Sequence, residues 1–208
     1  TSSDALYIAA ATDNKDYVFF EKDLNKQHSE TLLFHLNKLL SENNLKLDCF
    51  DCFCCVVGPG SFTGIRIGVT TTRAFAQVYD RPVMSVNSLQ LAAYNVKEKG
   101  FVISVKDAIR DKYYAAVYNG GSEIISANMY SIQELKRLKE QITADYGEAC
   151  IVYDGEIEGF EGVISPPFPD YCGFCRDKMG RGEVIGYNNL TPVYAALSQA
   201  ERSYEDKK

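Results

Sequence analysis

Histidine is scarce in this chain of 208 residues, since His28 and His35 are the only two. They do not form the H-E-x-x-H spacing in which two imidazoles and a glutamate serve a zinc-dependent protease. Basic residues are not in surplus either, because 22 lysines and arginines stand against 28 acidic residues and the formal net charge is −6. A protein that grips a polyanion unaided usually carries a basic surface. These shortages argue against a metalloprotease and against an independent nucleic-acid-binding protein.

Long apolar runs are absent from the sequence as well. No run approaches the roughly 18 residues needed to cross a bilayer. Residues 6–11 are too short for the apolar region of a secretory signal, and no basic region precedes them. We therefore expect a cytoplasmic protein that does not enter the membrane. With 46% hydrophobic and 24% charged residues, the composition is that of a globular protein that forms one compact unit or two small lobes.

The cysteines are odd in number: Cys49, Cys52, Cys54, Cys55, Cys150, Cys172 and Cys175. An odd count without a secretory signal favours reduced thiols over a disulfide framework. Cys49 with Cys52, and Cys172 with Cys175, have the C-x-x-C spacing of metal ligands. Three cysteines, however, lie in or beside a predicted strand, where cysteine behaves as a small apolar residue. We expect free thiols and no bound metal.

A glycine-rich turn between a strand and a helix is the most informative pattern in the chain. Residues 52–57 read as a short buried strand, and residues 63–79 as the following helix. The turn between them supplies a candidate anion-binding set: Gly58, Gly60, Ser61, Thr63 and Gly64. Glycine allows positive φ, and the two hydroxyl groups can cap the first turn of the helix. A cradle for an anion and a simple sharp corner both remain compatible with this pattern.

Two familiar nucleotide motifs are missing from that turn. The P-loop motif requires a lysine directly after its last glycine, whereas Gly64 is followed by Ile65 and Arg66. The dinucleotide motif G-x-G-x-x-G also fails, because the third glycine comes one position late.

Two amphipathic helices flank this turn in the sequence. The helix over residues 29–43 places its leucines on one face: Leu32, Leu33, Leu36, Leu39 and Leu40. Phe34 points nearly opposite to them. The central helix has one apolar face made of Ile65, Val69, Thr72 and Ala76. A second apolar face is made of Ile67, Thr71, Ala74 and Val78, and the two are separated by a polar stripe of Arg66, Thr70, Arg73 and Gln77. Two apolar faces predict that something besides the helix's own sheet covers it.

The remaining elements are predicted from alternation, turn residues and caps. Strands are expected at residues 5–11, 17–21, 83–86, 101–106, 113–118, 123–129 and 150–153. Helices are expected at residues 88–97 and 131–141, and an irregular segment at 155–186. The charged, glycine-closed stretch 97–100 predicts a boundary between an N-terminal lobe, residues 1–100, and a smaller C-terminal lobe, residues 101–208.

The string G-P-G-S-F-T-G-I-R-I-G at residues 58–68 resembles the signature of the TsaB (YeaZ) family. Further matches lie at residues 28–33, at Ser88-Leu89 and at Leu190-x-Pro192-Val193-Tyr194. The resemblance implies an α/β fold of the two-lobed actin, Hsp70 and sugar-kinase type (ASKHA), with mixed sheets flanked by helices.

The resemblance also implies a function. TsaB is a subunit of the bacterial machinery that makes N6-threonylcarbamoyladenosine in tRNA, and its partner TsaD carries ATP, metal and catalysis. It implies a heterodimer with TsaD, a third component TsaE, contact with tRNA only through the complex, and self-pairing when the partner is missing. Active members of the superfamily carry a metal-organising Asp on the first strand, where this chain reads Ile8-Ala9-Ala10. Because an aliphatic side chain cannot bind Mg²⁺, we expect a non-catalytic subunit without cofactor or metal. The alternative is an ASKHA-type small-molecule kinase or ATPase that uses the turn at residues 58–64.

The resemblance further implies that the two amphipathic helices lie side by side and form the partner interface. The residues expected there are Phe34 on the first helix and Ile67, Thr71, Ala74 and Val78 on the central helix. We choose the Ile67 face of the central helix because small residues let a partner helix approach closely.

Overall fold

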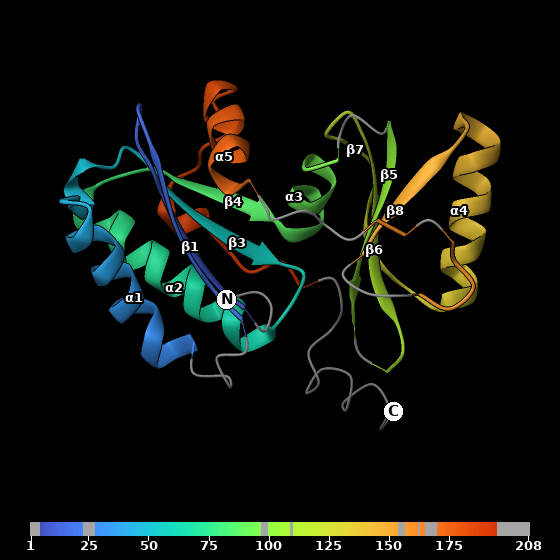
Figure 1. The fold of residues 1–208 in the computed structure, drawn as a ribbon, viewed down its shortest axis with the longest axis horizontal. Coiled ribbons are helices and arrows are strands. Elements are labelled where there is room, and N and C mark those ends of the chain that lie inside the picture. The colour runs from blue at the N-terminus through green and yellow to red at the C-terminus, as the bar shows by residue number, and fades with distance from the viewer. Residues whose placement is uncertain are drawn as a thin grey trace. The chain divides into compact units, whose positions relative to one another are not determined.

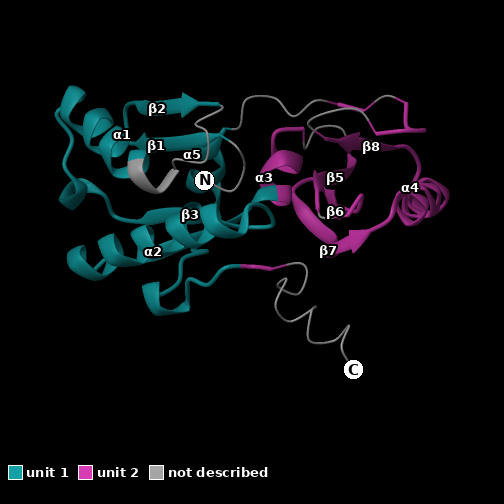
Figure 2. Cartoon of the chain, turned by 90° about the horizontal axis from the view of Figure 1, so that it is seen from below, with its two compact units in different colours: residues 1–88, 170–192 teal, residues 89–169, 193–208 magenta. Residues whose placement is uncertain are grey.

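A computed structural model describes residues 5–22, 28–96, 100–108, 110–153, 157–161, 163–164 and 170–194. The chain forms two compact units, one made of residues 1–88 and 170–192 and the other of residues 89–169 and 193–208 (Figure 2). This division differs from the expected split at residue 100. The first continuous part of the first unit ends at Ser88, and residues 170–192 also belong to that unit. Residues 97–99, at the expected boundary, lie outside the described residues.

The first unit begins with an antiparallel hairpin of β1 (Leu6–Ala11) and β2 (Asp16–Glu21), in which Leu6 pairs with Glu21 and Ala11 with Asp16. The helix α1 (His28–Glu42) and the short 3₁₀ helix η1 (Leu47–Cys49) follow. Next come β3 (Phe53–Gly58), α2 (Phe62–Tyr79) and β4 (Val83–Asn87). β3 and β4 are parallel, and α2 is the crossover connection that such a pair requires. Figure 1 shows α1 and α2 running side by side.

Two apolar clusters hold this unit together. In one, Leu39 of α1 packs on the inward side chains of β1, which are Leu6, Ile8 and Ala10. In the other, the buried face of α2 packs on β3 and β4: Ile65, Val69 and Ala76 against Cys55, Val57 and Val83, with Leu190. The alternation of buried residues along β1 therefore gives it one face for α1, as period-two patterning requires.

A helix lies where the sequence predicted irregular structure, so that prediction was wrong. α5 (Tyr171–Gly180) begins at Asp170, whose carboxylate accepts the backbone N–H of Gly173. It buries Cys172 and Phe174. After it, Ile185 pairs with Val83 of β4, the 3₁₀ helix η3 (Tyr187–Asn189) forms, and Leu190 enters the α2 core. These contacts explain why residues 170–192 belong to the first unit.

The second unit contains a mixed four-stranded sheet in the order β7-β6-β5-β8. Its elements are α3 (Ser88–Tyr94), β5 (Phe101–Asp107), β6 (Tyr113–Asn119), β7 (Ser122–Tyr130), α4 (Ile132–Tyr146) and β8 (Ala149–Val152). β5 is parallel to β8 and antiparallel to β6. The strands and helices predicted up to residue 153 are confirmed with shifted ends, and α4 extends to Tyr146.

Both faces of this sheet are covered. Ile103 and Val117 face α4 and pack on Leu135 and Ile142. Val102, one position along β5, packs on Leu89 and Ala93 of α3 together with Ala116. A capping box starts α4, because Ser131 and Glu134 each bind the other's backbone N–H. Within the described residues, no helix is both long and apolar enough to cross a membrane.

Candidate partner interface

The glycine-rich turn joins β3 to α2. Gly58 and Gly60 adopt φ of 126° and 155°, values that residues with a Cβ atom rarely adopt. Ser61 is the N-cap, because its Oγ accepts the backbone N–H of Gly64 at 3.3 Å. Thr63 was expected to cap as well, but it lies exposed inside the first turn. Ser61 thus already binds one of the N–H groups that a bound anion would use. The turn is held from the other side by Ser88, whose Oγ donates to the carbonyl oxygen of Pro59 at 2.6 Å.

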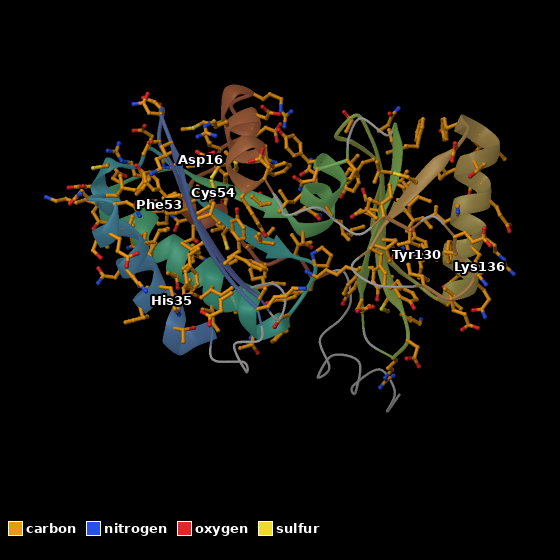
Figure 3. All side chains as sticks on the ribbon, viewed as in Figure 1. Asp16, His35, Phe53, Cys54, Tyr130 and Lys136 are labelled. Atoms are coloured by element: carbon orange, nitrogen blue, oxygen red, sulfur yellow. The ribbon has the colours of Figure 1, made fainter. Side chains whose placement is uncertain are left out.

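The end of the β1–β2 hairpin is bound by an arginine from α5. Arg176 donates through Nη1 to Asp16 Oδ2 at 3.0 Å and through Nη2 to the carbonyl oxygen of Thr12 at 3.1 Å. It also pairs with Asp16 Oδ1 (Asp16 is labelled in Figure 3). These hydrogen bonds lower the pKa of the Asp16 carboxyl group. A cation of the same chain therefore neutralises this carboxylate, while β1 itself carries only the apolar side chains of Ile8, Ala9 and Ala10 on the stretch where the resemblance led us to look for a metal-organising Asp.

The two apolar faces of α2 have different environments. The first face is buried: Ile65, Val69, Thr72 and Ala76. On the second face, Ile67 and Thr71 are half-buried, Ala74 is exposed, and Val78 is 74% exposed. The structure therefore places the Ile67 face outward, with most apolar exposure toward the C-terminal end of the helix.

A shallow hollow runs along the outer side of α2. It is lined by Arg66, Val69, Thr70, Arg73, Ala74, Gln77 and Pro192. Most of these residues belong to the polar stripe predicted between the two faces, and Pro192 comes from the segment after α5. The hollow brings two arginines beside Ala74, and the Arg66 guanidinium also stacks on the Phe62 ring, 3.9 Å from its centroid.

α1 adds exposed apolar side chains of its own. Phe34 is 63% exposed, as its predicted position opposite the leucines suggested. Leu33 was expected on the buried face but is 54% exposed. Leu40 lies two turns further along that face and is buried. The chain turns back directly after α1, because Leu45 donates its N–H to the Leu40 carbonyl. Leu33 itself is exposed, so periodicity alone misplaced it.

Histidine and cysteine are the remaining side chains that could serve a metal or catalytic site. His35 stacks on Phe19 with ring centroids 4.1 Å apart, and its Nε2 lies 3.7 Å from Glu21 Oε2. All seven cysteines are free. Among the described residues, no group of three or more His, Cys, Asp or Glu side chains is arranged to hold a metal ion.

Solved structures identify the class to which this fold belongs. A structure described as YeaZ from Pseudomonas aeruginosa has a TM-score of 0.71 at 22% identity and covers 93% of this chain and 97% of its own. Another, described as an uncharacterized protein with similarity to peptidase YEAZ from the same organism, has a TM-score of 0.74 at 22% identity, covering 94% and 96%. The chain thus shares the α/β fold of these two structures, in agreement with the fold that the sequence predicted.

Sequence comparisons then identify the family. The model of the family described as "TsaD: tRNA N6-adenosine threonylcarbamoyltransferase" matches residues 22–148. The tRNA threonylcarbamoyladenosine biosynthesis protein TsaB of Bacillus subtilis is 28% identical over 98% of this chain and 95% of its own length. TsaB of Escherichia coli K12 is 26% identical over 93% and 91%. The chain belongs to this TsaD-related family, and within it to the TsaB (YeaZ) group.

Proposed function

We propose that this chain is a non-catalytic subunit of the complex that forms N6-threonylcarbamoyladenosine in tRNA, and that it supports TsaD as its binding partner. One observation carries the proposal: α2 buries one apolar face in its own unit and presents a second to the outside. The relatives named TsaB match nearly the whole chain, which supports the pathway. Phe34 of α1 and Ile67, Thr71, Ala74 and Val78 of α2 form the proposed contact.

Three features support a role without catalysis. β1 offers no carboxylate between Leu6 and Ala11 to organise a metal ion. Arg176 binds the Asp16 carboxylate and the Thr12 carbonyl group at the end of the hairpin. Ser61 satisfies the N–H of Gly64 in the glycine-rich turn. The Asp16 carboxylate and the Gly64 N–H are thus engaged within the chain. An ATP molecule would find neither a carboxylate nor a lysine in the glycine-rich turn.

The charge of the chain supports tRNA contact through the complex rather than alone. A net charge of −6 opposes binding to a polyanion, which ordinarily depends on lysine and arginine contacts with phosphates. In this proposal TsaD holds the tRNA and the nucleotide, TsaE joins as a third component, and the chain contributes a surface of standard size, about 800 Å² per partner. Because the partners share a fold, the same surface pairs two copies of this chain when TsaD is absent.

Co-purification tests this function. The tagged chain, expressed together with the TsaD protein of the same genome, should retain TsaD through affinity and size-exclusion steps. The purified chain alone should neither hydrolyse ATP in the presence of Mg²⁺ nor modify tRNA. Separate elution of the two proteins would contradict the proposal. Metal-dependent ATP turnover that is lost in the Ser61→Ala variant would instead support the kinase or ATPase alternative.

A further inference from the structure

The helix α2 carries two positive charges and no acidic residue, although the chain as a whole contains 28 acidic residues among 208. Its charged side chains are Arg66 and Arg73, which lie about two turns apart and so project from one side of the helix. Thr70 and Gln77 continue the same stripe with further hydrogen-bond donors. Arg66, Thr70 and Gln77 are exposed, and Arg73 is half-buried. A basic stripe therefore lies on the surface of an acidic chain.

The hollow on the outer side of α2 gathers these donors beside apolar side chains. Arg66 and Arg73 line it together with Ala74 and with Pro192, which comes from the segment after α5. Of the seven described residues that line the hollow, none is acidic. An anion in the hollow would therefore meet two guanidinium groups, while the apolar side chains displaced part of its surrounding water. Loss of that water strengthens the attraction between opposite charges.

One of the two guanidinium groups is held in place within the chain itself. Arg66 stacks on the ring of Phe62, with its guanidinium carbon 3.9 Å from the ring centroid. Such a stack uses the flat face of the guanidinium group, whereas hydrogen bonds to a carboxylate use its edge. A side chain that is restricted in advance also loses less conformational entropy when a partner binds. The stack therefore favours an anion-binding role for Arg66.

We propose that this hollow binds an acidic side chain of TsaD, an aspartate or glutamate whose carboxylate accepts hydrogen bonds from Arg73 and Arg66. The inference rests on the proposed function, because it names the chemistry by which TsaD is recognised at the same helix. Arginine binds a carboxylate through two parallel N–H···O bonds, which fix the position of the partner. The Ile67 face of α2 then supplies apolar burial, and the basic stripe beside it supplies selectivity. A partner without the acid would leave two partly desolvated cations unpaired.

The charge of the whole chain favours a protein carboxylate over a nucleic-acid phosphate. A polyanion is held by many lysine and arginine contacts spread over a basic surface, and the formal net charge here is −6. A single carboxylate needs only one local site. Exposed charges farther away than about 8 Å are largely screened at physiological ionic strength. The acidic residues elsewhere on the chain therefore do not cancel the attraction of Arg66 and Arg73.

Calorimetric titration of the full chain with TsaD, at low and high sodium chloride concentration, tests this site. Arg73→Gln removes the charge and should weaken binding about tenfold, and Arg73→Glu should weaken it about 100-fold. Salt should weaken binding of the unsubstituted chain more than that of Arg73→Gln. Arg137→Gln is the matched control, since Arg137 is an exposed arginine on α4 of the second unit and its loss changes the net charge equally. That variant should bind TsaD as the unsubstituted chain does.

A charge exchange identifies the partner group. TsaD variants in which one surface aspartate or glutamate is replaced by arginine are titrated against Arg73→Glu. One of them should restore binding to Arg73→Glu while binding the unsubstituted chain poorly. Gln77→Glu keeps the test decisive if an Arg73 variant folds poorly, because Gln77 is exposed and lines the same hollow. A new carboxylate there should repel the acid of TsaD and weaken binding without changing the unfolding midpoint in urea.

Unchanged affinity for TsaD in folded Arg73→Glu and Gln77→Glu would overturn the proposal. If these variants instead lose self-association, or if the complex loses tRNA binding, the hollow belongs to a second copy or to RNA. Weakened binding that no acid-to-arginine exchange in TsaD restores would show that the group in the hollow is not a carboxylate of TsaD. All of these results leave the proposed function standing. Failure of the unsubstituted chain to bind TsaD would refute the proposed function itself and this inference with it.

Discussion

Ala74→Arg should weaken binding of this chain to TsaD by roughly 30-fold or more, equivalent to about 2 kcal/mol of binding free energy. Ala74 is exposed on the outer face of α2, beside Arg66 and Arg73 in the hollow. A third cation introduced there would enter the centre of the proposed contact, where it would lose water without gaining a partner. A small side chain also lets the partner helix approach, and arginine removes that space. Calorimetric titration of TsaD with each variant measures the change.

Ala144→Arg is the matched control for that substitution. Ala144 is also an exposed alanine within a helix, but it lies on α4 of the second unit. Its replacement should leave both the affinity and the fold unchanged. Because Ala74 is exposed in the chain alone, Ala74→Arg should unfold at nearly the same denaturant concentration as the unsubstituted protein. An unfolded Ala74→Arg variant, or a folded one with unchanged affinity, would show that this face of α2 is not the interface.

Leu190→Ala should reduce the free energy of unfolding by about 2–5 kcal/mol, the range for emptying a leucine site in a packed core. Leu190 is 0% exposed and packs with Ile65, Val69 and Ala76 under α2. The loss would show that the segment after α5 completes the core on which the partner-facing helix rests. Equilibrium unfolding in urea gives the difference.

Val193→Ala provides the comparison, since Val193 is 42% exposed only three positions further along the chain. Its effect should stay within about 0.5 kcal/mol, as for most surface substitutions. If Leu190→Ala is as mild as Val193→Ala, residues 170–192 do not support α2 in solution, and the assignment of this segment to the first unit fails.

The sequence predicted the elements best where pattern and local chemistry agree. The two faces of α2 follow from a spacing of 100° per residue, and glycine with a serine cap defines where that helix begins. Leu33 shows the limit of periodicity, because the same face of α1 is covered near Leu40 and uncovered two turns earlier. The local sequence determines which side of an amphipathic helix faces the core. How much of that side is buried depends on which distant segments of the chain pack against it.

α5 was beyond sequence reasoning because its pattern is weak. The buried set of α5 includes a lysine, Lys178, and the helix contains Gly173 and ends at Gly180, so its apolar period is weak. Asp170 was the available signal, as an N-cap directly after a proline-rich stretch.

The central claim is that this chain supports TsaD without catalysing the reaction itself. It is tested most directly by the amount of N6-threonylcarbamoyladenosine that TsaD forms in tRNA, with ATP, the threonylcarbamoyl donor and TsaE, in the presence and absence of this chain. The account predicts product when both proteins are present, background levels when either is omitted, and a loss with Ala74→Arg that excess protein restores. Equal product without this chain, or product formed by this chain without TsaD, would contradict it.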